Sequence, residues 1–296
     1  MYPFLAVLLL TGGARAAEPI LPLPPPPAMT AAARLGELLF HDPRLSGSGR
    51  IRCADCHRLD RGGDDDRPLP QIRTAPQPHN TPTVFNAAYH FYLHWYGEVP
   101  DLETQARIAL QRDMAVDWDR VLLRLRADAA YRKAFQDLYG RIDAEAVVAA
   151  LVAFERTLVT PSPFDRFLRG DETALTPKQR EGYRLFKAYG CSACHQGVNV
   201  GGNLRQKLGI FGRYRSDDPG RFAVTGREAD RDVFRVPSLR NVAVTAPYFH
   251  DGGVETLEKA IELMARLQLG IRLKPAEIDA IAAFLKSLTG RYREAR

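Results

Sequence analysis

At 296 residues the chain is long enough for two domains. Its formal net charge is +6, but no run of Lys or Arg alternates with aromatic residues that could stack on bases. A surface of mixed charge is the simpler interpretation, and we expect no nucleic acid among the partners.

The first residues have the pattern of an export signal. An apolar run over residues 4–10 precedes small residues and an Ala-Arg-Ala sequence at 14–16, which is typical of a signal peptide and its cleavage site. No Lys or Arg precedes the run, so an alternative interpretation is an uncleaved segment that tethers the protein to the membrane. The run is, however, too short for an ordinary spanning helix. We predict a signal peptide over 1–16 and an extended, proline-rich tether over 17–29 with little ability to form a core.

Two stretches with the same GxxLF spacing each end a predicted helix. They are residues 36–40 and 182–186. Thr30 and Thr176 are suitable N-caps for these helices, and Pro177 fits a first helical position because its missing N–H needs no partner there. The repeat predicts a duplicated module with different insertions.

Each GxxLF stretch is followed by a Cys-x-x-Cys-His motif, and together the two motifs use all four cysteines of the chain. Two cysteines at this spacing can each form a thioether with a haem vinyl group, while the next histidine binds the iron. Zinc would need closed tetrahedra of converging ligands, and the chain has only seven histidines. We therefore predict two covalent c-type haems, held by Cys53, Cys56, His57, Cys191, Cys194 and His195.

The rest of the chain has mainly helical patterns. Little of it alternates as strands do, and a long loop rich in Asp, Gly, Pro and Arg is expected over residues 58–82. The predicted fold class is mainly α, with two cytochrome c-like haem domains over 30–161 and 162–296. The spacing of apolar residues predicts helices at about 101–112, 117–127, 142–158, 257–267 and 278–288.

The function depends on the sixth ligand of each iron. An iron held by its histidine alone can bind peroxide, whereas a second strong ligand favours electron transfer. Met264 is the candidate for the second haem, although it also fits the apolar stripe of its own helix. Met114 could close the first iron in the same way, or it could only pack. In the latter case the adjacent Asp113 could move a proton between the peroxide oxygens, or it could be a solvated acid at a helix end.

Several longer stretches give the chain a clear likeness to a known family. It resembles the bacterial di-haem cytochrome c peroxidase superfamily, which includes MauG and MbnH, from about Leu35 to the end. The similar stretches are LFHDPRLSGSG (39–49), NTPTVFNAAY (80–89), SPFDRFLRGD (162–171), RVPSLRNVAVTAPYFHDG (235–252) and ELMARLQLG (262–270).

The resemblance implies a role for each haem. His57 would bind the low-potential, peroxidatic haem, and His195 with Met264 would bind the high-potential haem. Trp95 matches the tryptophan that lies between the haems and helps to couple them. The two haems would then lie near a shared domain interface.

The resemblance also implies further site residues. Asn80, with the backbone carbonyls of Thr245 and Pro247, matches a calcium site at the domain interface, and an oxygen-only set suits that hard cation. Gln105 falls where the family has a glutamine in the peroxidatic pocket.

The sequence departs from the family in two places. In an alignment without gaps, the catalytic glutamate of the family would fall at Ala115. Asp113 aligns with that glutamate only if two alignment positions are closed by a gap. Many relatives carry a histidine that closes the resting peroxidatic iron, but the histidine nearest to that loop is His79, directly before Asn80. We expect His79 to be a structural or propionate-side residue, and the first haem to be open at rest.

The leading functional hypothesis is a peroxidase that reduces hydrogen peroxide to water with electrons from a small cytochrome c or a copper protein (cupredoxin). One alternative is a MauG-like or MbnH-like enzyme that oxidises Trp or Tyr on a partner protein, its substrate, through a bis-ferryl state. Another is a non-enzymatic di-haem electron carrier with both Met114 and Met264 bound. We expect a periplasmic protein, because bacterial c-type haem is attached outside the cytoplasm, and the resemblance suggests a homodimer.

Overall fold

The structure is a computed structural model that describes residues 18–71 and 78–292. The predicted signal peptide over 1–16 lies outside the described residues. Among the helices of the described ranges, none combines the length and the apolar character needed to cross a membrane.

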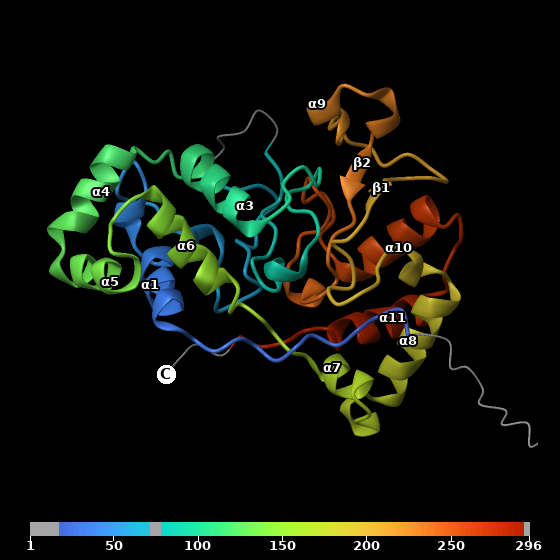
Figure 1. The fold of residues 1–296 in the computed structure, drawn as a ribbon. Coiled ribbons are helices and arrows are strands. Elements are labelled where there is room, and N and C mark those ends of the chain that lie inside the picture. The colour runs from blue at the N-terminus through green and yellow to red at the C-terminus, as the bar shows by residue number, and fades with distance from the viewer. Residues whose placement is uncertain (1–17, 72–77, 293–296) are drawn as a thin grey trace, which may run out of the picture.

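The molecule has two helical halves that lie side by side (Figure 1). The predicted mainly α class is confirmed, because the described strands are limited to one short antiparallel pair. The N-terminal half contains α1 (Ala31–Phe40), α2 (Cys53–Cys56), α3 (Leu102–Ile108), α4 (Trp118–Ala127), α5 (Ala129–Tyr139) and α6 (Ala144–Glu155). The C-terminal half contains α7 (Pro163–Leu168), α8 (Pro177–Ala188), β1 (Arg205–Lys207), α9 (Phe222–Thr225), β2 (Val233–Arg235), α10 (Leu257–Gln268) and α11 (Pro275–Lys286).

The helix starts agree with their predicted caps. The Thr30 hydroxyl accepts a hydrogen bond from the Ala33 N–H (3.1 Å), and the Thr176 hydroxyl accepts one from the Gln179 N–H (3.2 Å). Each bond satisfies a donor that the first helical turn leaves unpaired. The helix predicted at 101–112 is interrupted, since α3 ends at Ile108 and a π-helical turn, Ala109–Asp113, follows it.

A close helix crossing forms the centre of each half. On Gly36 of α1, a Cβ atom would lie 1.9 Å from the Ala150 carbonyl oxygen of α6. On Gly182 of α8, a Cβ atom would lie 1.9 Å from the Ala280 carbonyl oxygen of α11. Both helix pairs therefore meet backbone to backbone, which a residue with a side chain would prevent. The glycines of the two GxxLF stretches mark equivalent crossings and confirm the internal repeat.

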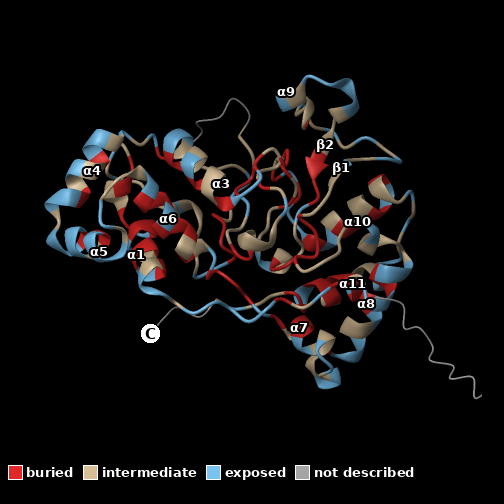
Figure 2. Cartoon of the chain, viewed as in Figure 1, coloured by how far each residue is buried: buried red, intermediate tan, exposed pale blue. Residues whose placement is uncertain are grey.

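The buried residues gather around these two crossings (Figure 2). One core cluster draws its buried residues from Leu35 to Leu158, and the other draws them from Phe164 to Leu288, together with Ile20. The bounds 30–161 and 162–296 remain our proposed domain limits, because they separate these clusters.

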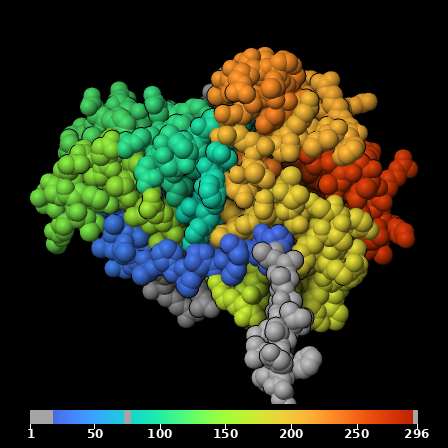
Figure 3. Space-filling view, turned by 45° about the vertical axis from the view of Figure 1, so that its right-hand side comes forward, coloured from blue at the N-terminus to red at the C-terminus, as the bar shows by residue number. Residues whose placement is uncertain are grey.

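The proline-rich segment, which was expected to have little ability to form a core, contributes two residues to the buried interior. Ile20 and Leu23 are fully buried against the C-terminal half, and the Leu23 N–H donates to the Asp165 carboxylate (2.7 Å). Three residues make one turn of a polyproline helix, so these two side chains share one face. The segment crosses the surface from one half to the other (Figure 3).

Candidate active site

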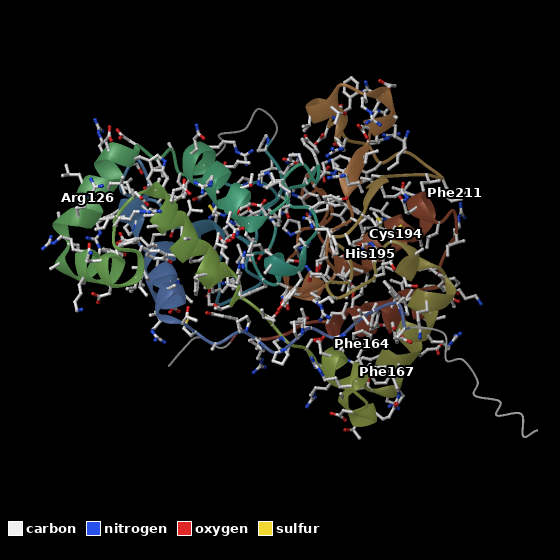
Figure 4. The ribbon with its side chains drawn as sticks, in the orientation of Figure 1. Arg126, Phe164, Phe167, Cys194, His195 and Phe211 are labelled. Carbon is white, nitrogen blue, oxygen red and sulfur yellow. The ribbon has the colours of Figure 1, made fainter. Side chains whose placement is uncertain are left out.

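The second Cys-x-x-Cys-His motif lies at the side of a largely apolar cavity in the C-terminal half. Cys191, Cys194 and His195 line this cavity together with Met264 of α10. Figure 4 shows Cys194 and His195 in the interior of the C-terminal half. Thr256 caps α10 by accepting from the Lys259 N–H (3.2 Å), which fixes the start of the helix that carries Met264.

His195 is suited to bind iron. Burial lowers the pKa of His195 to about 4, so its imidazole is neutral at pH 7. A neutral imidazole is the form that binds a metal ion. His195 and Met264 line one cavity, which is what the predicted pair of ligands requires.

The first motif lies beside a smaller cavity in the N-terminal half. Cys53 and His57 line it, and the His57 Nδ1 lies 3.2 Å from the Gly63 carbonyl oxygen. If Nδ1 carries the proton, this contact leaves Nε2 free for iron. A Cβ atom on Gly63 would lie 2.7 Å from the Thr83 hydroxyl, so the close contact requires glycine, whose φ is +78°.

Gln105 and Met114 also line the first cavity, but Asp113 does not. Asp113 is half exposed, and its carboxylate accepts a hydrogen bond from Arg112 Nε (2.9 Å). Its charge still acts on the haem-binding motif. Burial raises the pKa of the Cys56 thiol to about 11, and the Asp113 charge contributes to this increase.

Sequence reasoning missed Glu155, a half-buried acid at the end of α6 that lines the first cavity and whose Oε2 is buried. No hydrogen-bond partner of its Oε2 is found among the described residues. Burial, with a contribution from the Glu103 charge, raises the pKa of Glu155 to about 8. A single acid that ends an Ala- and Val-rich helix was the signal that could have identified it.

Arg235 was also missed, and it lines both cavities. Its Nε donates to the His94 carbonyl (2.9 Å), and its Nη1 lies 3.2 Å from His90 Nδ1. Burial lowers the pKa of Arg235 to about 10. Within the described ranges, no carboxylate forms a salt bridge with it. A buried guanidinium without an acidic partner fits a haem propionate, so the residues present fit haem in both cavities.

Two residues that the resemblance assigns to the region of the domain interface, Trp95 and Asn80, contact each other. Trp95 lines the second cavity, and its indole N–H donates to the Asn80 carbonyl (2.8 Å). The Asn80 N–H donates to the His250 carbonyl (2.8 Å), which joins this segment to the chain that follows Thr245 and Pro247. The described residues contain no group of three His, Cys, Asp or Glu side chains that could hold a metal ion.

His79 makes contacts that fit a structural role, one of the two roles expected of it. Its Nε2 lies 2.7 Å from the Asp218 carboxylate, and its ring lies 4.9 Å from the ring of Tyr96.

Comparison with known proteins identifies the family. A model described as di-haem cytochrome c peroxidase matches residues 30–173, and a cytochrome c model matches residues 179–289. The chain is 43% identical to the cytochrome c551 peroxidase of Nitrosomonas europaea, over 97% of this chain and 89% of that protein. It belongs to the di-haem cytochrome c peroxidase family.

Two further similarities extend this result. The methylamine utilization protein MauG of Methylorubrum extorquens is 35% identical over 86% of this chain and 77% of its own length. The crystal structure of a MauG-like protein associated with microbial copper homeostasis superposes with a TM-score of 0.78 at 30% identity, covering 94% of this chain and 95% of that chain. The predicted fold, the two haems and the class of enzyme, a cytochrome c peroxidase-type oxidoreductase, are confirmed.

Proposed function

We propose that the protein reduces hydrogen peroxide to water at the first cavity, with electrons that arrive through the second. The difference between the cavities carries this proposal. The carboxyl of Glu155 and the amide of Gln105 line the first cavity, whereas no Asp or Glu among the described residues lines the second. A methionine lines each cavity, Met114 the first and Met264 the second, and we assign only Met264 as an iron ligand. A thioether ligand favours electron transfer, and a polar cavity favours peroxide chemistry.

The haems would be held by residues from both halves. The four cysteines would form the thioethers, and the imidazoles of His57 and His195 would bind the irons. Arg235 would pair with propionates from both cavities. When bound, the haems supply the redox chemistry, while the protein sets ligands, access and proton supply.

The first cavity would need a proton donor close to bound peroxide. The Gln105 amide can donate a hydrogen bond to a peroxide oxygen, and the Asp113 carboxyl is our candidate for the group that moves the proton. Asp113 directly precedes Met114, a lining residue, and its carboxylate would have to leave Arg112 to act in the cavity.

The region between the cavities would couple them. We assign Trp95 to electron transfer between the haems, since it lines the second cavity and bonds to Asn80. We further propose calcium at the Asn80 side-chain oxygen and the Thr245 and Pro247 carbonyls, because these oxygen ligands suit a hard cation.

The electron donor would be a small cytochrome c or a cupredoxin, and the protein would act in the periplasm as a homodimer. Export would use the predicted signal peptide over residues 1–16. Covalent c-type haem supports this location.

A second candidate is oxidation of Trp or Tyr on a partner protein. The chain has no histidine between His57 and His79, so no imidazole from that loop would close the first iron. The third candidate, an electron carrier, is favoured by one observation, that the buried Met114 lines the first cavity.

Optical and paramagnetic spectra of the ferric, haem-loaded protein test the three functions together. The peroxidase is expected to show a high-spin fraction that disappears when cyanide binds, and to consume peroxide with reduced cytochrome c. A purely low-spin protein that ignores cyanide and peroxide would contradict both enzymatic functions. A long-lived oxidised species that forms without prior reduction would favour the protein-oxidising function.

A further inference from the structure

Trp95 belongs to a group of rings that continues behind the second cavity. Its ring centroid lies 6.3 Å from that of His250 and 6.5 Å from that of His79. Phe234 stacks on His250 at 4.3 Å, and Tyr96 lies 6.0 Å from Phe234 and 4.9 Å from His79. These five side chains, the Trp95 cluster, form a closed circuit of ring contacts. Through it Tyr96 is connected to the cavity wall, which Trp95, Phe234 and His250 line.

Tyr96 is the member of this cluster with a proton acceptor. Its hydroxyl donates to the Asp218 Oδ1 (2.9 Å), while the Asp218 Oδ2 lies 2.7 Å from His79 Nε2. The Gly220 N–H also donates to Oδ1 (2.7 Å). Three groups therefore hold this carboxylate in place.

The phenol of Tyr96 and the carboxylate of Asp218 have the charges that proton transfer between them requires. Burial and the neighbouring Asp218 charge raise the pKa of Tyr96, so the phenol keeps its proton at pH 7. Burial alone would raise the pKa of Asp218, but the hydrogen bonds from His79 and Gly220 outweigh it and lower that pKa. A neutral phenol thus faces an ionised carboxylate within hydrogen-bond distance.

We propose that Tyr96 is a redox-active tyrosine that gives one electron through the Trp95 cluster to the haem cavities and its phenolic proton to Asp218. Loss of the electron and the O–H proton leaves a neutral tyrosyl radical and a protonated carboxyl on Asp218. The oxidant is hydrogen peroxide, which needs two electrons and two protons to form two molecules of water. Tyr96 supplies one of these electrons and a haem supplies the other, while the protons come from solvent. An electron from the donor protein and return of the proton restore the phenol. The inference rests on the proposed peroxide chemistry.

The chain contains two matched tyrosines for comparison. The Tyr131 hydroxyl donates to the Asp42 carboxylate (2.8 Å) and is buried, but it lies on α5 and lines neither cavity. The Tyr214 hydroxyl donates to Asp251 (2.9 Å), and its ring lies 5.8 Å from that of His250. Tyr131 has a carboxylate acceptor but makes none of the described ring contacts with the Trp95 cluster. Tyr214 has both a carboxylate acceptor and a ring contact with this cluster, so it is the competing site.

The test mixes the ferric, haem-loaded protein with hydrogen peroxide in the absence of a donor and freezes it for electron paramagnetic resonance. The wild type is expected to give a tyrosyl signal, and Tyr96→Phe is expected to lose it. Tyr131→Phe should keep the full signal. Asp218→Asn, which removes the proton acceptor but not the phenol, should weaken it. An unchanged signal in Tyr96→Phe, or its loss in Tyr214→Phe instead, would overturn the inference.

The same samples separate this inference from the proposed function. Tyr96→Phe is expected to keep the optical spectrum of both ferric haems, so the loss of its tyrosyl signal would not reflect loss of haem. A wild type that consumes peroxide but forms no tyrosyl radical would overturn the role of Tyr96 alone. A wild type that does not react with peroxide would overturn both.

Discussion

The two halves share one scaffold and differ at the positions that face their cavities. Phe40 and Phe154 pack with ring centroids 5.3 Å apart next to the first helix crossing. Phe186 and Phe284 do the same at 5.1 Å next to the second. The residue after Phe154 and the residue after Phe284 each line the cavity of their own half. Here the halves diverge, because Glu155 corresponds to Leu285.

This divergence shows how a duplicated module acquires two functions. The glycine contacts and the phenylalanine pairs fix where the helices cross, and therefore where each cavity forms. A carboxyl in one cavity and a leucine in the other then give different environments. Burying an acid without a partner costs free energy, which the first half tolerates and the second avoids.

The largest expected effect comes from breaking one crossing at a time. Gly36→Val and Gly182→Val each place side-chain atoms within about 2 Å of a carbonyl oxygen on the facing helix. We expect each to destabilise its half by about 4 kcal/mol or more, because the helices must separate. Thermal unfolding of the haem-loaded protein measures this. Gly140→Asn is the control, since no atom lies within 4 Å of a Cβ atom there. A melting temperature unchanged by Gly36→Val would disprove the contact.

Sequence patterns predicted the parts of this comparison that depend on local chemistry. The Cys-x-x-Cys-His motifs, the GxxLF repeat and the caps at Thr30 and Thr176 could be identified because their chemistry requires fixed spacing. Met264 also lines the cavity of His195, as the resemblance implied.

The residues that were missed depend on tertiary contacts. Arg235 is unusual only because residues distant in sequence bury it between two cavities without an acidic partner. In the sequence, Glu155 has the pattern of a polar residue at the end of a helix. Its position at the cavity depends on how the helices pack. Ile20 and Leu23 are two apolar residues in a proline-rich segment, and their burial requires the surface of the C-terminal half.

The next prediction compares the two methionines. Met264→Ala is expected to lower the reduction potential of the second haem by on the order of 100 mV, because a thioether ligand raises the potential. Turnover with reduced cytochrome should slow. Met114→Ala should leave the potential of the first haem unchanged if that residue only packs. Spectroelectrochemical titration measures both potentials. Unaltered optical and redox properties in Met264→Ala would exclude it as a ligand.

The third prediction concerns Arg235, which lines the cavities of both halves. Arg235→Met removes a buried positive charge from the walls of both cavities, so uptake of an electron becomes less favourable and both reduction potentials should fall by on the order of tens of mV. The control is Arg240→Met. Arg240 is equally buried but pairs with Asp165 (3.0 Å) and lines neither cavity. That variant should cost about 3 kcal/mol or more of stability, because it leaves Asp165 unpaired. A potential that falls for one haem only would show that Arg235 serves a single cavity.

The smallest expected effect concerns pH and the Glu155–Leu285 difference. Burial raises the pKa of Glu155 to about 8, well above the value of about 4.3 expected in the unfolded chain. Between these values the folded protein binds the extra proton, so the free energy of unfolding should decrease as pH rises from about 5 to about 8. Glu155→Gln should flatten that slope, which denaturant unfolding at several pH values measures.

Glu145→Gln on the same helix supplies the control for this slope. Glu145 is exposed, and its hydrogen bond from Arg107 lowers its pKa. The contribution of Glu145 therefore changes only below the unfolded value, and its replacement should leave the slope above pH 5 intact. If Glu155→Gln and Glu145→Gln gave the same slope as the wild type, Glu155 would be ionised throughout this range. Glu155 would then be a charged residue at pH 7 where the other half has the neutral Leu285, instead of a protonated, neutral acid.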